Sequence, residues 1–271
     1  MRASPSGELP RRGFAADADV WAISLDLEHE PGEAAVSLLA QDEEARMRRY
    51  RRPADARRFA GARAALRIVL GAYLGRLPSD LTFDTTCRFC GGSHGKPRVQ
   101  CGELEFSASR SGAVAVIAVS PSAVGVDVES VPVAANADEL SQAVLSSAEQ
   151  ATVRRLPGDR RRDAVVECWV RKEAVLKAAG RGLAVDPRTL SVTVDDSAGT
   201  PRITATPSAH PELGGWMLAD LGAALPTGYM GALALRVPSP RVAVFCVTTG
   251  SDPESLLGAL SSDPHARGLA A

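Results

Sequence analysis

Hydrophobic positions along this chain follow two kinds of pattern, one typical of β-strands and one typical of helices. Alternating or short continuous apolar runs predict strands at 20–27, 114–119, 124–128, 189–194, 202–206, 229–237 and 241–248. Helical patterns are found at 33–40, 41–74, 136–155 and 162–179. Pro53 divides the second helical segment into two helices, and Gly180 ends the last one, as glycine often does.

The order of these elements predicts an α+β fold made of two halves. We place the N-terminal half at 19–122 and the C-terminal half at 123–249, with flexible tails at 1–18 and 250–271. The strands predicted on either side of a Ser-Pro-Ser turn near the middle of the chain are interpreted as a strand pair. No strict sequence repeat relates the two halves.

The composition is that of an ordinary globular protein. The chain has 271 residues, of which 45% are apolar and 23% charged, and its formal net charge is −1. The balanced charge argues against a protein that coats nucleic acid with its whole surface. No apolar stretch reaches the length of a membrane span. The polar start of the chain and its five cysteines, an odd and low number, favour a cytoplasmic protein with reduced thiols.

Two acidic side chains interrupt the apolar segment Gly125-Val-Asp127-Val-Glu129. Alternate residues of a strand point to the same face, so Asp127 and Glu129 project together while the valines pack behind them. Two carboxylates on one rigid face suit a hard cation such as Mg²⁺. A solvated strand edge is the alternative explanation.

A third acidic position lies in the helix that contains Trp169-Val-Arg-Lys-Glu173-Ala-Val-Leu-Lys177. The spacing of four residues places Trp169, Glu173 and Lys177 on one stripe of the helix. Glu173 is therefore able to complete a three-carboxylate site with Asp127 and Glu129, and Lys177 is able to hold a phosphate. An exposed Glu–Lys pair is the alternative explanation.

Three basic regions are candidates for anion binding. Gly95-Lys96-Pro97-Arg98 and Phe106-Ser-Ala-Ser109-Arg110 combine hydroxyl groups, backbone N–H groups and cations near a strand entry, which suits phosphate. Residues 45–76 contain ten arginines and one acid, a density suited to an anionic ligand, an acidic partner or nucleic acid. A basic surface turn and a solubilising helix face are the alternatives.

The segment Cys87-Arg-Phe-Cys90-Gly-Gly-Ser-His94 has the ligand spacing of part of a zinc knuckle. Cys101 is the only nearby candidate for a fourth ligand. Buried or merely adjacent thiols are the alternative explanation for these cysteines.

Taken together, these motifs resemble those of the Sfp-type 4'-phosphopantetheinyl transferases. The resemblance rests on GKP at 95–97, FSASR at 106–110, GVDVE at 125–129 and WVRKEAVLKAAGRGL at 169–183. It implies two similar α+β halves in a pseudo-two-fold arrangement, the first contributing to coenzyme binding and the second carrying the metal site. It also implies transfer of the 4'-phosphopantetheine arm of coenzyme A to a serine of an apo carrier protein of fatty-acid, polyketide or peptide synthesis, which leaves adenosine 3',5'-bisphosphate.

The resemblance also implies roles for individual residues. Asp127, Glu129 and Glu173 match the family's Mg²⁺ ligands. Lys177 matches the lysine of the catalytic helix. Because the serine needs a base within hydrogen-bond reach, Glu173 is the first candidate for that base, acting directly or through a metal-bound water. The positions that match coenzyme-binding residues are Arg46, Arg63, Lys96, Pro97, Ser109 and Arg110. A monomer without nucleic-acid or membrane partners is expected, because two fused halves need no second chain to build the site.

One departure from the family pattern concerns the FSASR segment, where Ser107 replaces an asparagine and Arg110 a histidine. Arginine stays charged and can hold a phosphate with two hydrogen bonds, so coenzyme binding is expected to survive, whereas a role for a neutral imidazole is not. Two alternative functions follow from the other motifs. One is an Arg-rich, zinc-containing nucleic-acid-binding protein, which leaves the three acids unexplained, and the other is an inactive coenzyme A-binding homologue.

Overall fold

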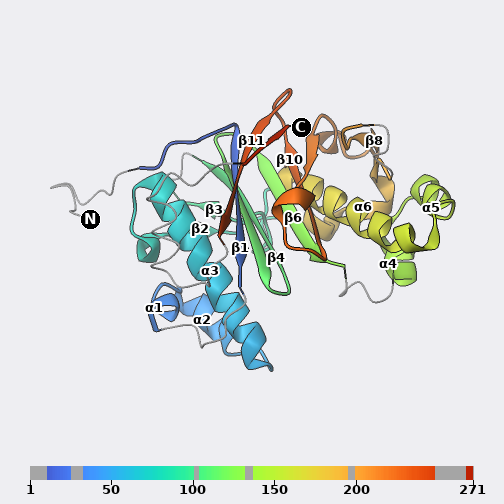
Figure 1. Cartoon of the computed structure of the whole chain (residues 1–271). Helices are drawn as coiled ribbons and strands as arrows, with labels where there is room; N and C mark the ends of the chain where they lie inside the picture. Colours follow the sequence, from blue (N-terminus) through green and yellow to red (C-terminus); the bar gives the residue numbers. More distant parts are fainter. Residues whose placement is uncertain are drawn as a thin grey trace.

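Two β-sheets lie between two long helices, so that the layers run helix, sheet, sheet, helix (Figure 1). The computed structural model describes residues 11–25, 33–100, 104–131, 137–194, 199–247 and 267–270. The long helices are α3 (Pro53–Leu74), which covers the first sheet, and α6 (Gly158–Ala179), which covers the second. Pro53 begins α3, and Gly180 follows α6 in the left-handed conformation with φ 70°, as predicted for both residues.

The first sheet has five strands in the order β12-β11-β1-β5-β4. β1 pairs in parallel with β11 and antiparallel with β5, and β5 forms a hairpin with β4. The bounds of these strands are β1 Ala18–Ser24, β4 Glu105–Ser111, β5 Val114–Ser120, β11 Arg241–Val247 and β12 Arg267–Ala270.

The second sheet has three antiparallel strands in the order β6-β10-β9, namely β6 Val124–Ser130, β10 Tyr229–Leu235 and β9 Met217–Asp220. Its strand order β6-β10-β9 repeats the order β1-β5-β4 of the first sheet. In each half a first strand leads to a long helix and then to a hairpin whose last strand pairs with the first strand. These units are β1, α3, β4–β5 and β6, α6, β9–β10. The fold class is therefore α+β with two similar halves, as expected.

The smaller elements surround this framework. The short helices are α1 (Glu33–Val36), α2 (Gln41–Met47), α4 (Ala137–Val144) and α5 (Ser147–Val153). Two short ladders pair β2 (Phe83–Asp84) with β3 (Arg98–Val99) and β7 (Ser191–Val192) with β8 (Ile203–Ala205). The segment between β2 and β3 carries the cysteine motif and Gly95-Lys96-Pro97.

Three apolar clusters hold the layers together. One lies between α3 and the first sheet, where Trp21 and Phe245 stack with ring centroids 4.5 Å apart. A second fills the space between the two sheets with small residues such as Val20 and Val126. The third lies between the second sheet and α6 and includes Val170. Alternate residues of β6 therefore face the first sheet and α6 in turn.

The predicted pairing of the two central strands is wrong. β5 and β6 belong to different sheets, because β5 pairs with β1 and β4 whereas β6 pairs with β10. The Ser-Pro-Ser turn between them carries the chain from one sheet to the other. The strands β4 and β9 were not predicted. Residues 106–110, expected in a loop at a strand entry, lie within β4. β11, from the segment assigned to the second half, completes the first sheet beside β1.

The predicted tails lie largely outside the described residues, which begin at residue 11 and omit 248–266. Within them, Ala18 is the first residue of β1, and residues 267–270 form β12. Within the described residues no helix combines the length and the hydropathy needed to cross a membrane.

Candidate active site

Gly125 allows β6 and α6 to pack closely enough to share a site. A Cβ atom at this position would lie 2.0 Å from the carbonyl oxygen of Ala174 and 2.4 Å from the backbone nitrogen of Ala178. Both distances are far shorter than van der Waals contact, so the strand backbone rests directly on the helix backbone. Asp127 and Glu129 follow Gly125 at alternate positions and therefore share its face.

Three carboxylates meet at this contact between strand and helix. Asp127 and Glu173 are 3% and 9% exposed, and Glu129 is half-buried. Among the described residues, Asp127 Oδ2 and Glu173 Oε1 are buried without a hydrogen-bond partner. Buried acidic oxygens without donors are unfavourable. Oxygen atoms of this kind are the ligands that a hard cation prefers, so the residues present fit Mg²⁺.

Burial, together with the neighbouring charges, changes the acidity of the carboxylates. Burial raises the pKa of Glu173 to about 7, Lys177 opposes this shift, and Asp127 and Glu129 add to it. Burial raises the pKa of Glu129 as well, against hydrogen bonding from Ser111 and in concert with Asp127. A carboxyl group that titrates near neutral pH is suited to accept a proton in a reaction.

Lys177 lies on α6 one turn after Glu173, and its side chain contacts Asp127 of β6. Its ammonium group is 2.5 Å from Asp127 Oδ1 and 3.0 Å from Ser109 Oγ. The Ser109 hydroxyl donates to the same Oδ1 atom at 2.7 Å. The predicted stripe of Glu173 and Lys177 thus faces the predicted pair on β6, and Ser109 joins them from β4 in the first sheet.

Alternate serines of β4 connect the first sheet to β6. Ser107 Oγ accepts a hydrogen bond from Val126 N at 3.0 Å, and Ser111 Oγ accepts one from Ser130 N at 3.0 Å. The Ser111 hydroxyl also donates to Glu129 Oε2 at 2.8 Å. Sequence reasoning assigned no function to Ser111 and treated Ser107 only as a departure. The signal for both was the spacing of Ser107, Ser109 and Ser111 by two, which places them on one face of a strand.

The three carboxylates do not form a closed ligand cluster. Within the described part of the chain, the group of three potential ligands whose atoms all lie within 4.8 Å of one another consists of Cys87, Cys90 and His94. The oxygens of Asp127, Glu129 and Glu173 are more widely spaced, and Lys177 lies among them. They would have to move closer to one another to share a single cation.

Two adjoining cavities reach from the first half towards Lys177. One, of about 290 Å³, lies between α2–α3 and the β4–β5 hairpin, and the other, of about 230 Å³, lies beside the segment 94–97. They share Arg63, Leu66 and Ala108, and the second is also lined by Lys177. The six positions predicted to bind the coenzyme all line these cavities, namely Arg46, Arg63, Lys96, Pro97, Ser109 and Arg110.

Several of these basic side chains have protein partners. Arg63 Nε donates to Glu43 Oε1 at 2.7 Å. Lys96 Nζ donates to Glu105 Oε2 at 2.7 Å and to the Val124 carbonyl at 2.9 Å, and burial lowers its pKa. Lys96 therefore joins the loop before β3 to the start of β6. The guanidinium group of Arg46 lies 5.3 Å from the ring centre of Phe59 in the wall of the first cavity.

The Arg-rich region does not form one exposed basic face. Arg67 is buried, and its guanidinium group donates to Glu43 Oε2 at 2.8 Å and to the carbonyl oxygens of Pro78 and Leu81. Part of this region thus stabilises α3 against its neighbours. The alternative of a nucleic-acid-binding protein is not favoured.

The fold and site define an α+β enzyme of two similar halves, with a carboxylate and lysine centre next to a basic cavity. The model of the 4'-phosphopantetheinyl transferase superfamily matches residues 123–220, which include the three carboxylates and Lys177. A solved structure, the holo-ACP-synthase of Plasmodium yoelii, aligns with a TM-score of 0.33 and 19% identity over 42% of this chain and 91% of that chain.

Two curated proteins match more of the sequence. The chain is 32% identical over 173 residues to the 4'-phosphopantetheinyl transferase HetI of a Nostoc species, covering 62% of this chain and 70% of that protein. It is 32% identical over 169 residues to a Synechocystis protein, slr0495, described as a candidate enzyme of the same kind, covering 61% and 65%. The chain belongs to the 4'-phosphopantetheinyl transferase superfamily. It is a phosphopantetheinyl transferase.

Proposed function

We propose that this enzyme transfers 4'-phosphopantetheine from coenzyme A to a serine of an apo carrier protein, in a Mg²⁺-dependent reaction that releases adenosine 3',5'-bisphosphate. Asp127, Glu129 and Glu173 are the proposed metal ligands. The observation that carries the proposal is the pair of buried carboxylate oxygens without donors, on Asp127 and Glu173, next to a cavity lined by basic side chains.

The reaction exchanges one bond of the coenzyme pyrophosphate. The serine oxygen of the carrier bonds to the phosphorus that bears the pantetheine arm, and the bond from that phosphorus to the bridging oxygen breaks. Bound Mg²⁺ would withdraw negative charge from the pyrophosphate. Glu173 takes the serine proton, a role supported by its position next to Lys177, which lines the second cavity.

The cationic side chains bind and orient the coenzyme. Lys177 lines the second cavity and lies next to Asp127, so we assign to it the stabilisation of charge on the transferring phosphate. Arg110 and Arg46 line the first cavity, where guanidinium groups can bind a phosphate through two hydrogen bonds. Arg63 lines both cavities and connects the two.

The test is the intact mass of apo carrier proteins incubated with coenzyme A and MgCl₂. We expect a gain of one 4'-phosphopantetheine group, and no gain in EDTA. A panel of carriers from fatty-acid, polyketide and peptide synthesis is needed to find the physiological substrate. A chain that modifies none of them, or that works equally well in EDTA, would contradict the proposal.

Variants at the carboxylates test the metal assignment separately. Asp127→Asn and Glu173→Gln are expected to lower the transfer rate on the order of a thousand-fold, because each removes a proposed ligand and Glu173 also a base. Glu167→Gln, on the same helix, changes a carboxylate that pairs with Arg160 and should leave the rate unchanged. Near-normal transfer by Asp127→Asn would show that the assignment of the metal ligands is wrong.

We also expect the protein to be a monomer in light scattering.

A further inference from the structure

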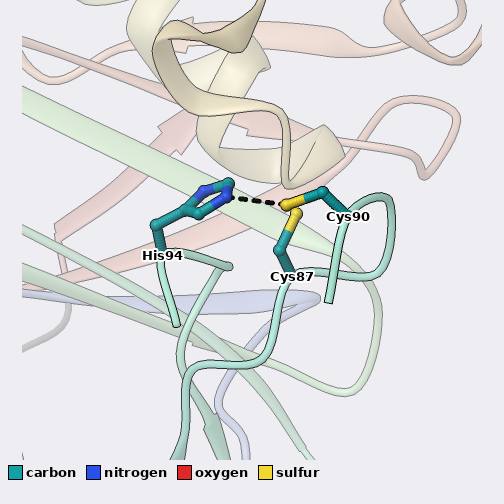
Figure 2. Close-up of side chains that lie close together, drawn as sticks. All are labelled: Cys87, Cys90 and His94. Carbon is teal, nitrogen blue, oxygen red and sulfur yellow. Dashed lines mark hydrogen bonds between the residues drawn. The ribbon is translucent and has the colours of Figure 1, made fainter. Parts of the chain in front are cut away.

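The loop between β2 and β3 gathers three potential metal ligands away from the carboxylate centre. Cys87, Cys90 and His94 point towards one another, with ligand atoms that all lie within 4.8 Å (Figure 2). Cys90 Sγ and His94 Nε2 are 2.9 Å apart. We propose that these three side chains bind a structural zinc ion. Cys101, the fourth candidate ligand named from the sequence, lies outside the described residues.

The ligand types and distances suit zinc. Two thiolates and one imidazole are borderline-soft ligands, which favour Zn²⁺ over Mg²⁺ or Ca²⁺. In a tetrahedral zinc site a sulfur and a nitrogen ligand lie about 3.6 Å apart, so the contact of Cys90 with His94 needs to widen by only about 0.7 Å. Cys90 and His94 are exposed, which leaves the remaining coordination position open to a fourth ligand.

The backbone of the loop is folded tightly around Cys87. Cys87 N donates to the Gly92 carbonyl at 2.7 Å, and Gly91 N donates to the Cys87 carbonyl at 2.9 Å. Gly91 has φ 75°, and a Cβ atom on Gly95 would lie 2.7 Å from Cys87 N. Only glycine fits at both places. The glycines between and after the ligands thus serve to bring the ligands together.

The Cys87 sulfur lies among hydrogen-bond donors. Backbone N–H groups of Phe89 and Cys90 donate to it, and the guanidinium group of Arg181 lies nearby. Arg181 also lies over the ring of Phe89, 3.4 Å from its centre, and pairs with Glu212. The loop is thereby attached to the segment that follows α6.

The position of this site suggests what the metal would do. His94 lines the same cavity as Gly95, Lys96 and Pro97, the residues that follow it in the loop. A zinc ion bound by His94 would fix the start of that segment and restrict the motion of the cavity wall. The ion is thus a structural element of the first half, and its ligands are not those of the carboxylate centre.

The test is the zinc content of the full-length chain, loaded with ZnCl₂ under reducing conditions, dialysed and analysed by mass spectrometry of the metal. One zinc per chain is expected for the wild type and for Cys246→Ser, which changes an exposed thiol in β11. Cys90→Ser and His94→Ala, both at exposed positions, should each lose the ion while keeping the circular dichroism of the wild type.

Cobalt gives a second readout, because Co²⁺ bound to thiolates in a tetrahedral site absorbs strongly in the visible range. The wild type and Cys246→Ser should give this spectrum, and Cys87→Ser and Cys90→Ser should not. A wild-type chain that binds neither metal, or that is isolated with a Cys87–Cys90 disulfide, would overturn the proposal. So would zinc retained at full occupancy by Cys90→Ser. None of these readouts depends on transferase activity.

Discussion

The two halves of the molecule use the same framework but place different residues on it. β1 and β6 each have seven residues, and α3 and α6 each have 22. Counted from the start of each element, Trp21 and Ile23 of β1 correspond to Asp127 and Glu129 of β6. Ile68 and Ala72 of α3 correspond in the same way to Glu173 and Lys177 of α6.

The side chains at these positions face the same way in both halves, since each strand presents them to its long helix. In the first half Trp21, Ile23 and Ile68 belong to the apolar cluster under α3. In the second half the corresponding positions hold the acids of the candidate active site. One framework thus builds a hydrophobic core where these positions are apolar and a polar centre where they are charged.

The fifteenth residue of each long helix has the same role in both halves. Arg67 of α3 and Lys172 of α6 are both buried, and each donates to a glutamate of the preceding short helix, Glu43 or Glu149. Each cation also donates to backbone carbonyls, and each glutamate accepts from the backbone at the start of its own helix. The neighbouring residues Lys172 and Glu173 therefore join a structural cation to a site residue.

The largest effect is expected from removing the cation of the second half. Lys172→Met leaves the buried Glu149 without its charged partner and should lower the free energy of unfolding by about 4 kcal/mol. Arg67→Met should cost less, because Glu43 keeps its pair with Arg63. Urea denaturation of both variants measures the difference. Equal losses in the free energy of unfolding would contradict the expectation that Arg63 compensates Glu43 when Arg67 is removed.

The second prediction concerns the close approach of strand and helix. The residue of β1 that corresponds to Gly125 is Asp19, which carries a side chain, so only the second half depends on a glycine here. Gly125→Ala would push α6 away from β6, with an expected loss of about 3 kcal/mol and of transferase activity. Gly158→Ala, where an added Cβ meets no atom, is the control for thermal unfolding and for rate. A Gly125→Ala enzyme of normal stability would contradict the packing argument.

Local periodicity was enough to predict which side chains of the site share a face within each element. The alternation in Gly125-Val-Asp127-Val-Glu129 and the spacing of four between Glu173 and Lys177 each define one face of one element. The structure brings these two faces together. The roles of these residues in metal binding and catalysis stay predictions.

Pairings between distant segments could not be predicted in the same way. Strands 114–119 and 124–128 are neighbours in sequence and both apolar, which favoured a hairpin, yet they lie in different sheets because each finds its partners elsewhere. β11 joins β1 across more than two hundred residues. The bond of Ser111 to Glu129 likewise depends on how the two sheets pack, which no local pattern records.

The third prediction uses acidity to separate the polar centre from its apolar counterpart. In the folded chain the pKa of Glu173 is about 7 and therefore above its unfolded value. In EDTA the folded state then holds more protons than the unfolded state between about pH 4.5 and 7, so stability falls as pH rises through this window. Glu173→Gln removes this loss of stability, because its side chain does not titrate. The corresponding residue of the first half, Ile68, does not titrate either.

The variant should therefore be more stable than the wild type by roughly 3 kcal/mol at pH 8, and the difference should vanish towards pH 4.5. Thermal unfolding at several pH values in EDTA measures it, with Glu167→Gln as the control. A constant difference at all pH values would mean that the carboxyl group of Glu173 does not titrate in this window.

The smallest effect is expected at the serines that join the halves. Ser107→Ala and Ser111→Ala each remove an acceptor of a β6 backbone N–H group and should each cost about 1 kcal/mol in urea denaturation. Only Ser111 also donates to Glu129, and this bond lowers the pKa of that carboxyl group. Ser111→Ala should therefore raise the Mg²⁺ concentration needed for half-maximal transfer by about tenfold, whereas Ser107→Ala should not change it. If the two variants need the same Mg²⁺ concentration, the bond from Ser111 to Glu129 does not affect metal binding. Both serines would then have a purely structural role.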